Sequence, residues 1–302
     1  MMMSLSARTA MAVHGIGVFE LDGNANVDPN AVEPNDVTPG EDWNLVVPTK
    51  DPSSAALAKA FAGENVEALG NDANYFTGGG SKDTNDVSQW KYGGNAVPDK
   101  NQITNAYAAA YSSGGKLYIY FGADRYSNDG DSALGFWLFK STVSLGANGS
   151  FNGNHTDGDL FIVSDFSNGG TIGTISVYRW NGGANGSLGS TASATGADCR
   201  NATGDHLVCA RVNGSSVTDH RAPWPYTPKP NIGTPGTFPL LTFFEGGLDV
   251  TALAGPDACF SSFLAETRSS TSTTAQLKDF ALAQLNTCDA RISINPSGVN
   301  PV

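Results

Sequence analysis

Strand-like runs, rich in β-branched and aromatic residues, recur along most of the chain between turn-forming residues. These runs are 17–21, 103–111, 116–124, 134–140, 159–166, 174–180, 206–212, 240–246, 260–269 and 275–285. Connections such as "SSGG", "SNDGD" and "NGGANGS" offer Gly and Asn, which adopt the positive φ angles of hairpin turns. Short strands at this spacing predict an all-β sandwich or barrel. We expect a single β-sandwich of the jelly-roll or concanavalin-like type.

Helical periodicity is confined to two segments. In 53–69, Ala, Leu and Phe recur at helical spacing behind serines that can cap a helix. This segment is therefore the best candidate for a helix, with Leu57, Phe61 and Leu69 packed against the sandwich. The segment 246–255 predicts one short turn capped by Asp249. Neither segment is long enough to build a helical layer.

The domain organisation follows from the distribution of strands and prolines. No unit of about 20 to 50 residues repeats, which argues against a propeller or solenoid. The Pro-rich stretch 222–239 lies between two strand-like runs and predicts a long surface crossover within one domain. We expect a β-sandwich domain at 16–289, preceded by a residual export segment or disordered N-terminus at 1–15. Residues 290–302 are expected to form a C-terminal tail or linker.

The charge balance excludes some classes of partner. The chain of 302 residues has 29 Asp and Glu against 17 Lys and Arg, a formal net charge of −12. Nucleic acids and anionic membranes are bound by clustered Lys and Arg, so neither is expected as a partner. The apolar runs are shorter than the roughly 18 residues of a transmembrane helix, so no membrane span is expected.

The four cysteines indicate an oxidising compartment. Cys199, Cys209, Cys259 and Cys288 form no C-x-x-C pair and have no histidine pattern that completes a zinc site. Sequential pairing would join Cys199 to Cys209 and Cys259 to Cys288, while two other pairings and four buried thiols stay open. An even cysteine count in a Gly-, Ser- and Thr-rich acidic chain favours disulfides. We expect an extracellular or cell-surface protein.

Aromatic residues alternate along several of the predicted strands. In 116–124, Tyr118 and Tyr120 fall on one face, and Trp137, Tyr178 and Trp180 lie on later strands. Rings on an open sheet face stack on the apolar faces of sugars, so these five residues are candidate glycan ligands. The alternative is that the rings pack against the second sheet or the 222–239 crossover.

An acidic turn separates two strands in "FGADRYSNDGDSALGFWLF", residues 121 to 139. Calcium takes six to eight oxygen ligands, and closely spaced carboxylates and Asn side chains can supply several of them. We expect Asp124, Asn128, Asp129 and Asp131 to line a calcium site, because Arg125 can neutralise only one of the aspartates. An ordinary solvated turn is the alternative, since Asp and Asn also favour turns.

Catalytic patterns are weak. Hydrolysis of a glycan needs two carboxylates across a cleft, and the candidates are Glu245, Asp249 and Glu266. Because Arg268 follows it closely, we interpret Glu266 as a structural ion-pair position. No nucleophile elbow and no H-E-x-x-H motif accompanies the histidines. We expect His155, His206 and His220, which lie on loops or strand starts, to be exposed.

Several long segments resemble a family of exported bacterial surface proteins that has no characterised function. They include "FELDGNA", "GEDWNLV", "LYIYFGADRYSNDGDSALGFWLF", "DGDLFIVSDFSNGG" and "CFSSFLAETRSSTSTTAQLKDFAL", and the resemblance spans residues 17 to 288. It implies a region that precedes immunoglobulin-like or transthyretin-like repeats. More loosely, "ELDGN…DW" and "LYIYFGADR" are similar to jelly-roll carbohydrate-binding modules of family 9 and to concanavalin-like lectins.

Together, these features predict a surface or adhesion module that binds carbohydrate and is not catalytic. Its expected partners are a glycan or cell-surface polymer and adjacent repeat domains of a longer surface protein. One alternative is a polysaccharide lyase or glycoside hydrolase on the same scaffold, since one fold hosts many functions. Another is a purely structural surface subunit.

Overall fold

The computed structural model describes Val13 and residues 16–27, 40–63, 72–79, 82–166, 172, 174–195, 198–199 and 207–289. Every structural statement below concerns this part of the chain. The expected export segment at 1–15 lies outside the described residues apart from Val13. The expected tail at 290–302 lies wholly outside them.

Strands dominate the described residues. They are β1 (Ala58–Gly63), β2 (Asp72–Phe76), β3 (Tyr92–Asn95), β4 (Ile103–Ser113), β5 (Lys116–Arg125), β6 (Ser132–Phe139), β7 (Ser144–Leu145), β8 (Phe151–Asn152), β9 (Leu160–Phe166), β10 (Thr174–Asn181), β11 (Ser187–Thr195), β12 (Val208–Val212), β13 (Phe243–Asp249), β14 (Ser262–Arg268) and β15 (Leu277–Gln284). The α-helices are α1 (Trp43–Val46) and α2 (Val250–Ala254). Neither they nor any other described helix is long and apolar enough to cross a membrane.

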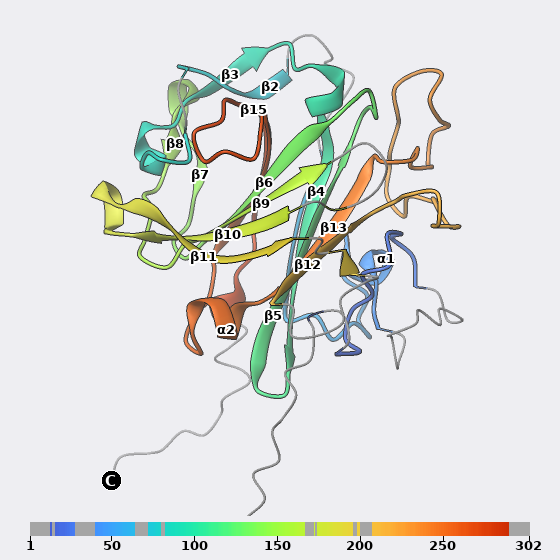
Figure 1. Ribbon diagram of the computed structural model, residues 1–302, viewed down its shortest axis with the longest axis horizontal. Coiled ribbons are helices and arrows are strands. Elements are labelled where there is room, and N and C mark those ends of the chain that lie inside the picture. Colours follow the sequence, from blue (N-terminus) through green and yellow to red (C-terminus); the bar gives the residue numbers. More distant parts are fainter. Residues whose placement is uncertain are drawn as a thin grey trace, which may run out of the picture.

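Antiparallel pairing joins the strands into two large sheets. The five-stranded sheet has the order β1-β4-β5-β13-β12, and the eight-stranded sheet has the order β11-β10-β9-β6-β14-β15-β2-β3. The two sheets pack against each other (Figure 1), and α1 lies against β13, where Nε1 of Trp43 donates to Glu245. The prediction of an all-β sandwich is confirmed.

The core between the sheets is built by strand alternation. On β5, Leu117, Ile119 and Phe121 point inward and are buried, and Phe136 on β6 meets them from the other sheet. The ring centroids of Phe121 and Phe136 are 4.8 Å apart. Burying side chains of this size stabilises the fold by about 1.5–3 kcal/mol each.

The outer face of the five-stranded sheet is also covered. Residues 16–27 and 40–56, called the N-terminal cover below, lie on it together with the 222–239 crossover. Phe19 stacks on Tyr120 with ring centroids 4.5 Å apart, and Trp224 from the crossover lies 4.8 Å from Tyr107. The crossover joins β12 to β13 as predicted, and its aromatic side chains are buried.

The outer face of the eight-stranded sheet carries a third cluster. Trp137 of β6 and Phe161 of β9 stack at 4.5 Å, and Trp90 packs against Trp137 and Phe151 of β8 from outside the sheet. The sandwich therefore has three apolar layers, one between the sheets and one on each outer face.

The helix predicted at 53–69 is wrong over its described part. Residues 58–63 form β1, which pairs with β4 so that Phe61 lies opposite Tyr107. Ala60 faces the inner core and Phe61 the outer cluster, so the segment follows a period of two. Because its alanines fit either period, pairing with the edge of β4 decides the structure. Residues 64–71, which include Leu69, lie outside the described residues.

Two smaller predictions are confirmed. Asp249 caps α2, and its side chain accepts a hydrogen bond from the Ala252 N–H at 2.9 Å. The cysteines form disulfides in sequential order, Cys199 with Cys209 and Cys259 with Cys288.

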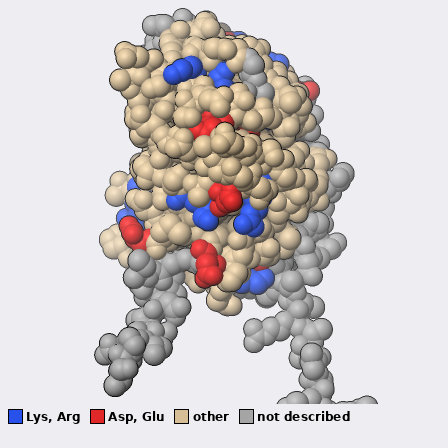
Figure 2. Space-filling view, turned by 90° about the vertical axis from the view of Figure 1, so that its left-hand side faces the viewer, with Lys and Arg blue, Asp and Glu red and all other residues tan. Residues whose placement is uncertain are grey.

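On the face shown in Figure 2, acidic and basic side chains lie in small groups separated by uncharged surface.

Candidate functional site

The predicted platform on β5 is not open to solvent. Tyr120 is fully buried, and its hydroxyl donates to the Val13 carbonyl at 3.0 Å. Tyr118 is 4% exposed. The N-terminal cover fills the face on which both rings lie, so the expected open face is absent at these two residues.

The rings predicted on the other strands lie on the far side of the sandwich. Trp137 and Trp180 are fully buried in the cluster outside the eight-stranded sheet, while Tyr178 is half-buried. His155 stacks on Trp180 at 4.0 Å, and its Nδ1 lies 3.0 Å from Oδ2 of Asp159. The expectation that His155 is exposed is therefore wrong, because the aromatic cluster encloses it. The five predicted rings thus form no common platform.

Asp124 is a buried structural carboxylate. It is 1% exposed, accepts from Nδ2 of Asn105 at 2.9 and 3.2 Å, and accepts from Nε1 of Trp224 at 2.9 Å. Burial raises the pKa of Asp124 to about 8, although the hydrogen bonds from Asn105 and Trp224 act in the opposite direction. Its oxygens face the layer under the crossover rather than the solvated turn.

The remaining predicted calcium ligands are engaged separately. Asn128 donates to a backbone carbonyl, and Asp129 forms an ion pair with Lys229, which also pairs with Asp99 at 3.0 Å. Asp131 is exposed. Within the described ranges, no group of three His, Cys, Asp or Glu side chains could hold a metal ion. The structure therefore does not gather the four residues into one cluster, and Lys229 and Arg125 place positive charge near the turn.

Glu245 holds the N-terminal cover on the five-stranded sheet. Its Oε1 accepts from the Gly23 N–H at 2.6 Å, and its Oε2 accepts from Nε1 of Trp43 at 2.9 Å. Burial, followed by the charge of Asp22, raises the pKa of Glu245 well above its usual range. The same two causes raise the pKa of Asp42. The carboxylate of Glu245 therefore joins the N-terminal cover to β13 and is fully buried.

The other two candidate carboxylates are structural as well. Arg268 donates to Oε1 of Glu266 at 3.1 Å and pairs with Asp83 at 2.9 Å, so the ion pair predicted at Glu266 is confirmed. Burial, followed by the charge of Asp83, raises the pKa of Glu266. Asp249 pairs with Lys116 at 2.8 Å. Glu266 and Asp249 are at most 3% exposed, so neither meets a ligand from solvent in this structure.

A hollow opens at the edge of the eight-stranded sheet where β2 leaves β15. The two strands share one registered pair, Tyr75 with Asp279, and β2 then runs into a turn that contains Gly78 and Gly79. This edge pocket has a volume of about 200 Å³. Its lining residues are Tyr75, Phe76, Thr77, Gly78, Gly79, Lys82, Asn95, Gln276 and Leu277.

The floor of the edge pocket is apolar and well supported. Phe76 and Leu277 are almost completely buried, and both belong to the cluster outside the eight-stranded sheet. The Phe76 ring lies 4.7 Å from that of Phe280 and 5.8 Å from that of Trp90. The floor is therefore rigid because it is the outer surface of a packed aromatic layer.

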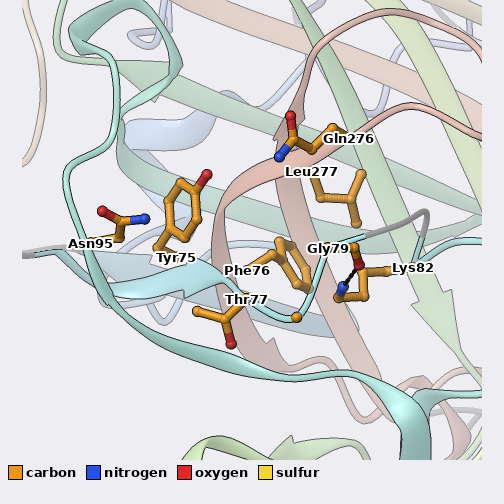
Figure 3. A pocket seen from close by; sticks show the side chains of 9 residues that line it. Tyr75, Phe76, Thr77, Gly79, Lys82, Asn95, Gln276 and Leu277 are labelled. Carbon is orange, nitrogen blue, oxygen red and sulfur yellow. Dashed lines mark hydrogen bonds between the residues drawn. The ribbon is translucent and has the colours of Figure 1, made fainter.

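The rim of the edge pocket is polar. Figure 3 shows Tyr75 and Asn95 on one side, Gln276 on the other, and Phe76 with Thr77 between them. Oε1 of Gln276 accepts from Nζ of Lys278 at 3.0 Å, which leaves its amide N–H groups as potential donors to a ligand. An apolar floor with a few hydrogen-bonding side chains is the usual composition of a small-molecule site.

Lys82 closes the edge pocket from the loop after β2. Its side chain donates to the Gly79 carbonyl, as the dashed line in Figure 3 marks. Burial lowers the pKa of the Lys82 amino group, and the neighbouring Asp83 acts in the opposite direction. The edge pocket thus presents a half-buried ring, amide and hydroxyl groups, and one cation.

Sequence reasoning missed every residue of this site. Tyr75 and Gln276 come together only because β2 and β15 are neighbours in the sheet, although about two hundred positions separate them. The only local signal is a tyrosine followed by the glycine-rich turn "TGGG", and a glycine turn alone does not indicate a pocket. Comparisons of the chain with protein-family models, curated proteins and solved structures found no match.

Proposed function

We propose that this protein is an extracellular surface or adhesion module that binds carbohydrate through the edge pocket and does not act on it chemically. The observation that carries the proposal is the half-buried Tyr75 ring beside the hydrogen-bonding side chains of Thr77, Asn95 and Gln276. A ring can stack on the apolar face of a sugar while amide and hydroxyl groups bind the sugar hydroxyls.

The size of the edge pocket limits what it can take. Its volume of about 200 Å³ is below the range of roughly 300–1,000 Å³ that suits drug-sized ligands. We therefore expect one sugar residue to enter, at the end of a chain or as a side branch of a polymer.

Two further observations support a binding role outside the cell. None of the described lining residues is Asp or Glu, so the edge pocket lacks the paired carboxylates of glycoside hydrolysis. Disulfides persist in oxidising compartments, and both disulfides fit an exported protein. Adjacent repeat domains of a longer surface protein remain part of this proposal.

A glycan microarray tests the proposal. We expect the folded protein to bind at least one class of glycan and the Tyr75→Ala variant to lose that signal. The array displays each glycan in many copies, so a high protein concentration should reveal even millimolar affinities. The absence of any bound glycan under these conditions would contradict carbohydrate binding.

A further inference from the structure

Lys82 is an unusual residue for the wall of a pocket. It is 6% exposed, and lysine is almost never buried to this extent unless it is paired with a carboxylate. Its hydrogen bond goes instead to the neutral carbonyl oxygen of Gly79. Within the described residues, no carboxylate forms an ion pair with it.

Two acidic residues next to lining residues, one in sequence and one in register, form their bonds elsewhere. Asp83, the residue after Lys82, accepts from Nε1 of Trp137 at 3.0 Å and pairs with Arg268 at 2.9 Å. Asp279, which pairs in register with Tyr75, accepts from the Ile103 N–H at 2.6 Å. Asp83 is held against the cluster outside the eight-stranded sheet and Asp279 against the start of β4, so neither forms an ion pair with Lys82.

Two more lysines lie close to the edge pocket. Lys278 donates to Gln276, a lining residue, and the backbone carbonyl of Lys91 accepts from the N–H of Thr77, another lining residue, at 2.9 Å. The whole chain carries a net charge of −12 and repels anions at long range. The edge pocket has one lysine in its lining, two lysines beside it and no acidic lining residue. Its local charge is therefore opposite in sign to the net charge of the whole chain.

We propose that the sugar that occupies the edge pocket is acidic, and that Lys82 binds its anionic group. This inference rests on the proposed function, because it names the class of glycan that the same site takes. The group is a carboxylate, as in a uronic acid, or a sulfate ester. A charge-assisted hydrogen bond from an ammonium group is about twice as strong as a neutral one, and burial away from water favours it further.

The test compares matched pairs of polymers that differ only in charge. The first pair is polygalacturonate and its fully methyl-esterified form, and the second is a sulfated galactan and its desulfated form. Affinity electrophoresis or calorimetry measures binding to each. The proteins are the wild type, Lys82→Gln, Lys82→Arg and Lys140→Gln.

Lys140→Gln is the matched control because it removes one positive charge at the opposite end of the same sheet. Residue 140 directly follows Phe139, which pairs with Ser262, whereas the edge pocket lies at the end where Arg268 pairs with Leu277. Thermal melting of all four proteins shows whether each variant is folded.

We expect at least tenfold tighter binding to one charged polymer than to its neutral partner. Lys82→Gln should lose that preference, while Lys82→Arg and Lys140→Gln should keep it. Preference within the first pair assigns a uronate, and preference within the second assigns a sulfate.

Equal binding within both pairs, or a preference that survives in folded Lys82→Gln, would overturn the inference. If neutral glycans bind and Tyr75→Ala abolishes that binding, the proposed function stands without an acidic ligand. If no polymer and no arrayed glycan binds, both fail.

Discussion

The indole N–H of Trp224 donates a hydrogen bond to Oδ2 of Asp124 over 2.9 Å, although 100 positions separate the two residues. The bond ties the 222–239 crossover to β5 in a layer that excludes water. Burial in this layer leaves the ionised form of Asp124 poorly solvated and raises the pKa of Asp124 to about 8, although the bond from Trp224 acts in the opposite direction.

The first prediction is that Asp124 makes stability fall with pH. The folded protein holds the Asp124 proton up to about pH 8, whereas an unfolded chain releases it above about pH 4. The stability that this proton contributes is complete below about pH 4. It is lost as the pH rises to about 8, at roughly 1.4 kcal/mol per pH unit.

Urea unfolding at pH 5, 6.5 and 8 measures this dependence. Asp124→Asn should flatten the decline, and Asp131→Asn, an exposed position in the following turn, should leave it unchanged. Identical slopes in the wild type and Asp124→Asn would show that Asp124 does not titrate in this range.

The second prediction concerns the disulfides, whose partners are 10 and 29 positions apart. The chain-entropy model assigns about 2.8 kcal/mol to the Cys199–Cys209 loop and about 3.6 kcal/mol to the Cys259–Cys288 loop. The double variant Cys259→Ser with Cys288→Ser should therefore lose more unfolding free energy than the other double variant. Peptide mapping under non-reducing conditions checks the pairing, and four free thiols would contradict both bonds.

The third prediction compares the contributions of Arg268 and Glu266 to the stability of the buried ion-pair network that also contains Asp83. Arg268→Met should cost about 3–5 kcal/mol of unfolding free energy, because it leaves the Asp83 carboxylate buried without its cation and Glu266 without its hydrogen-bond donor. Glu266→Gln should cost less than about 1.5 kcal/mol, since burial already favours the neutral form of Glu266 and the amide keeps its shape. Chemical denaturation of both variants tests this, and the opposite ranking would be inconsistent with the network described.

The strands were predictable because the residues that face the core between the sheets recur at every second position, which is a local pattern in the sequence. On β5, for example, the inward residues Leu117, Ile119 and Phe121 are apolar without exception. What covers the outer face was not predictable, because Phe19 and Trp224 reach Tyr120 and Tyr107 from segments far apart in the chain. The aromatic outer face therefore resembled an open platform in the sequence.

The candidate site was hidden for the same reason. The clustered acids near Asp129 predicted a calcium site. In the structure Lys229, which is 100 positions later in the chain, forms an ion pair with Asp129. The edge pocket instead combines a few residues of β2, β3 and β15 with the loops beside them, and none of these is conspicuous among its own neighbours. Sheet order, which depends on contacts distant in sequence, decides where such a pocket opens.

The central claim is that carbohydrate binds at the edge pocket, and two matched tyrosines test it directly. Tyr75 and Tyr178 are both half-buried, but Tyr75 lines the edge pocket and Tyr178 lies on β10. Titration calorimetry with the strongest microarray ligand compares Tyr75→Ala, Tyr178→Ala and the wild type. We predict at least a tenfold weaker association for Tyr75→Ala and an unchanged one for Tyr178→Ala. Full affinity in Tyr75→Ala, with loss of binding in Tyr178→Ala, would contradict the account.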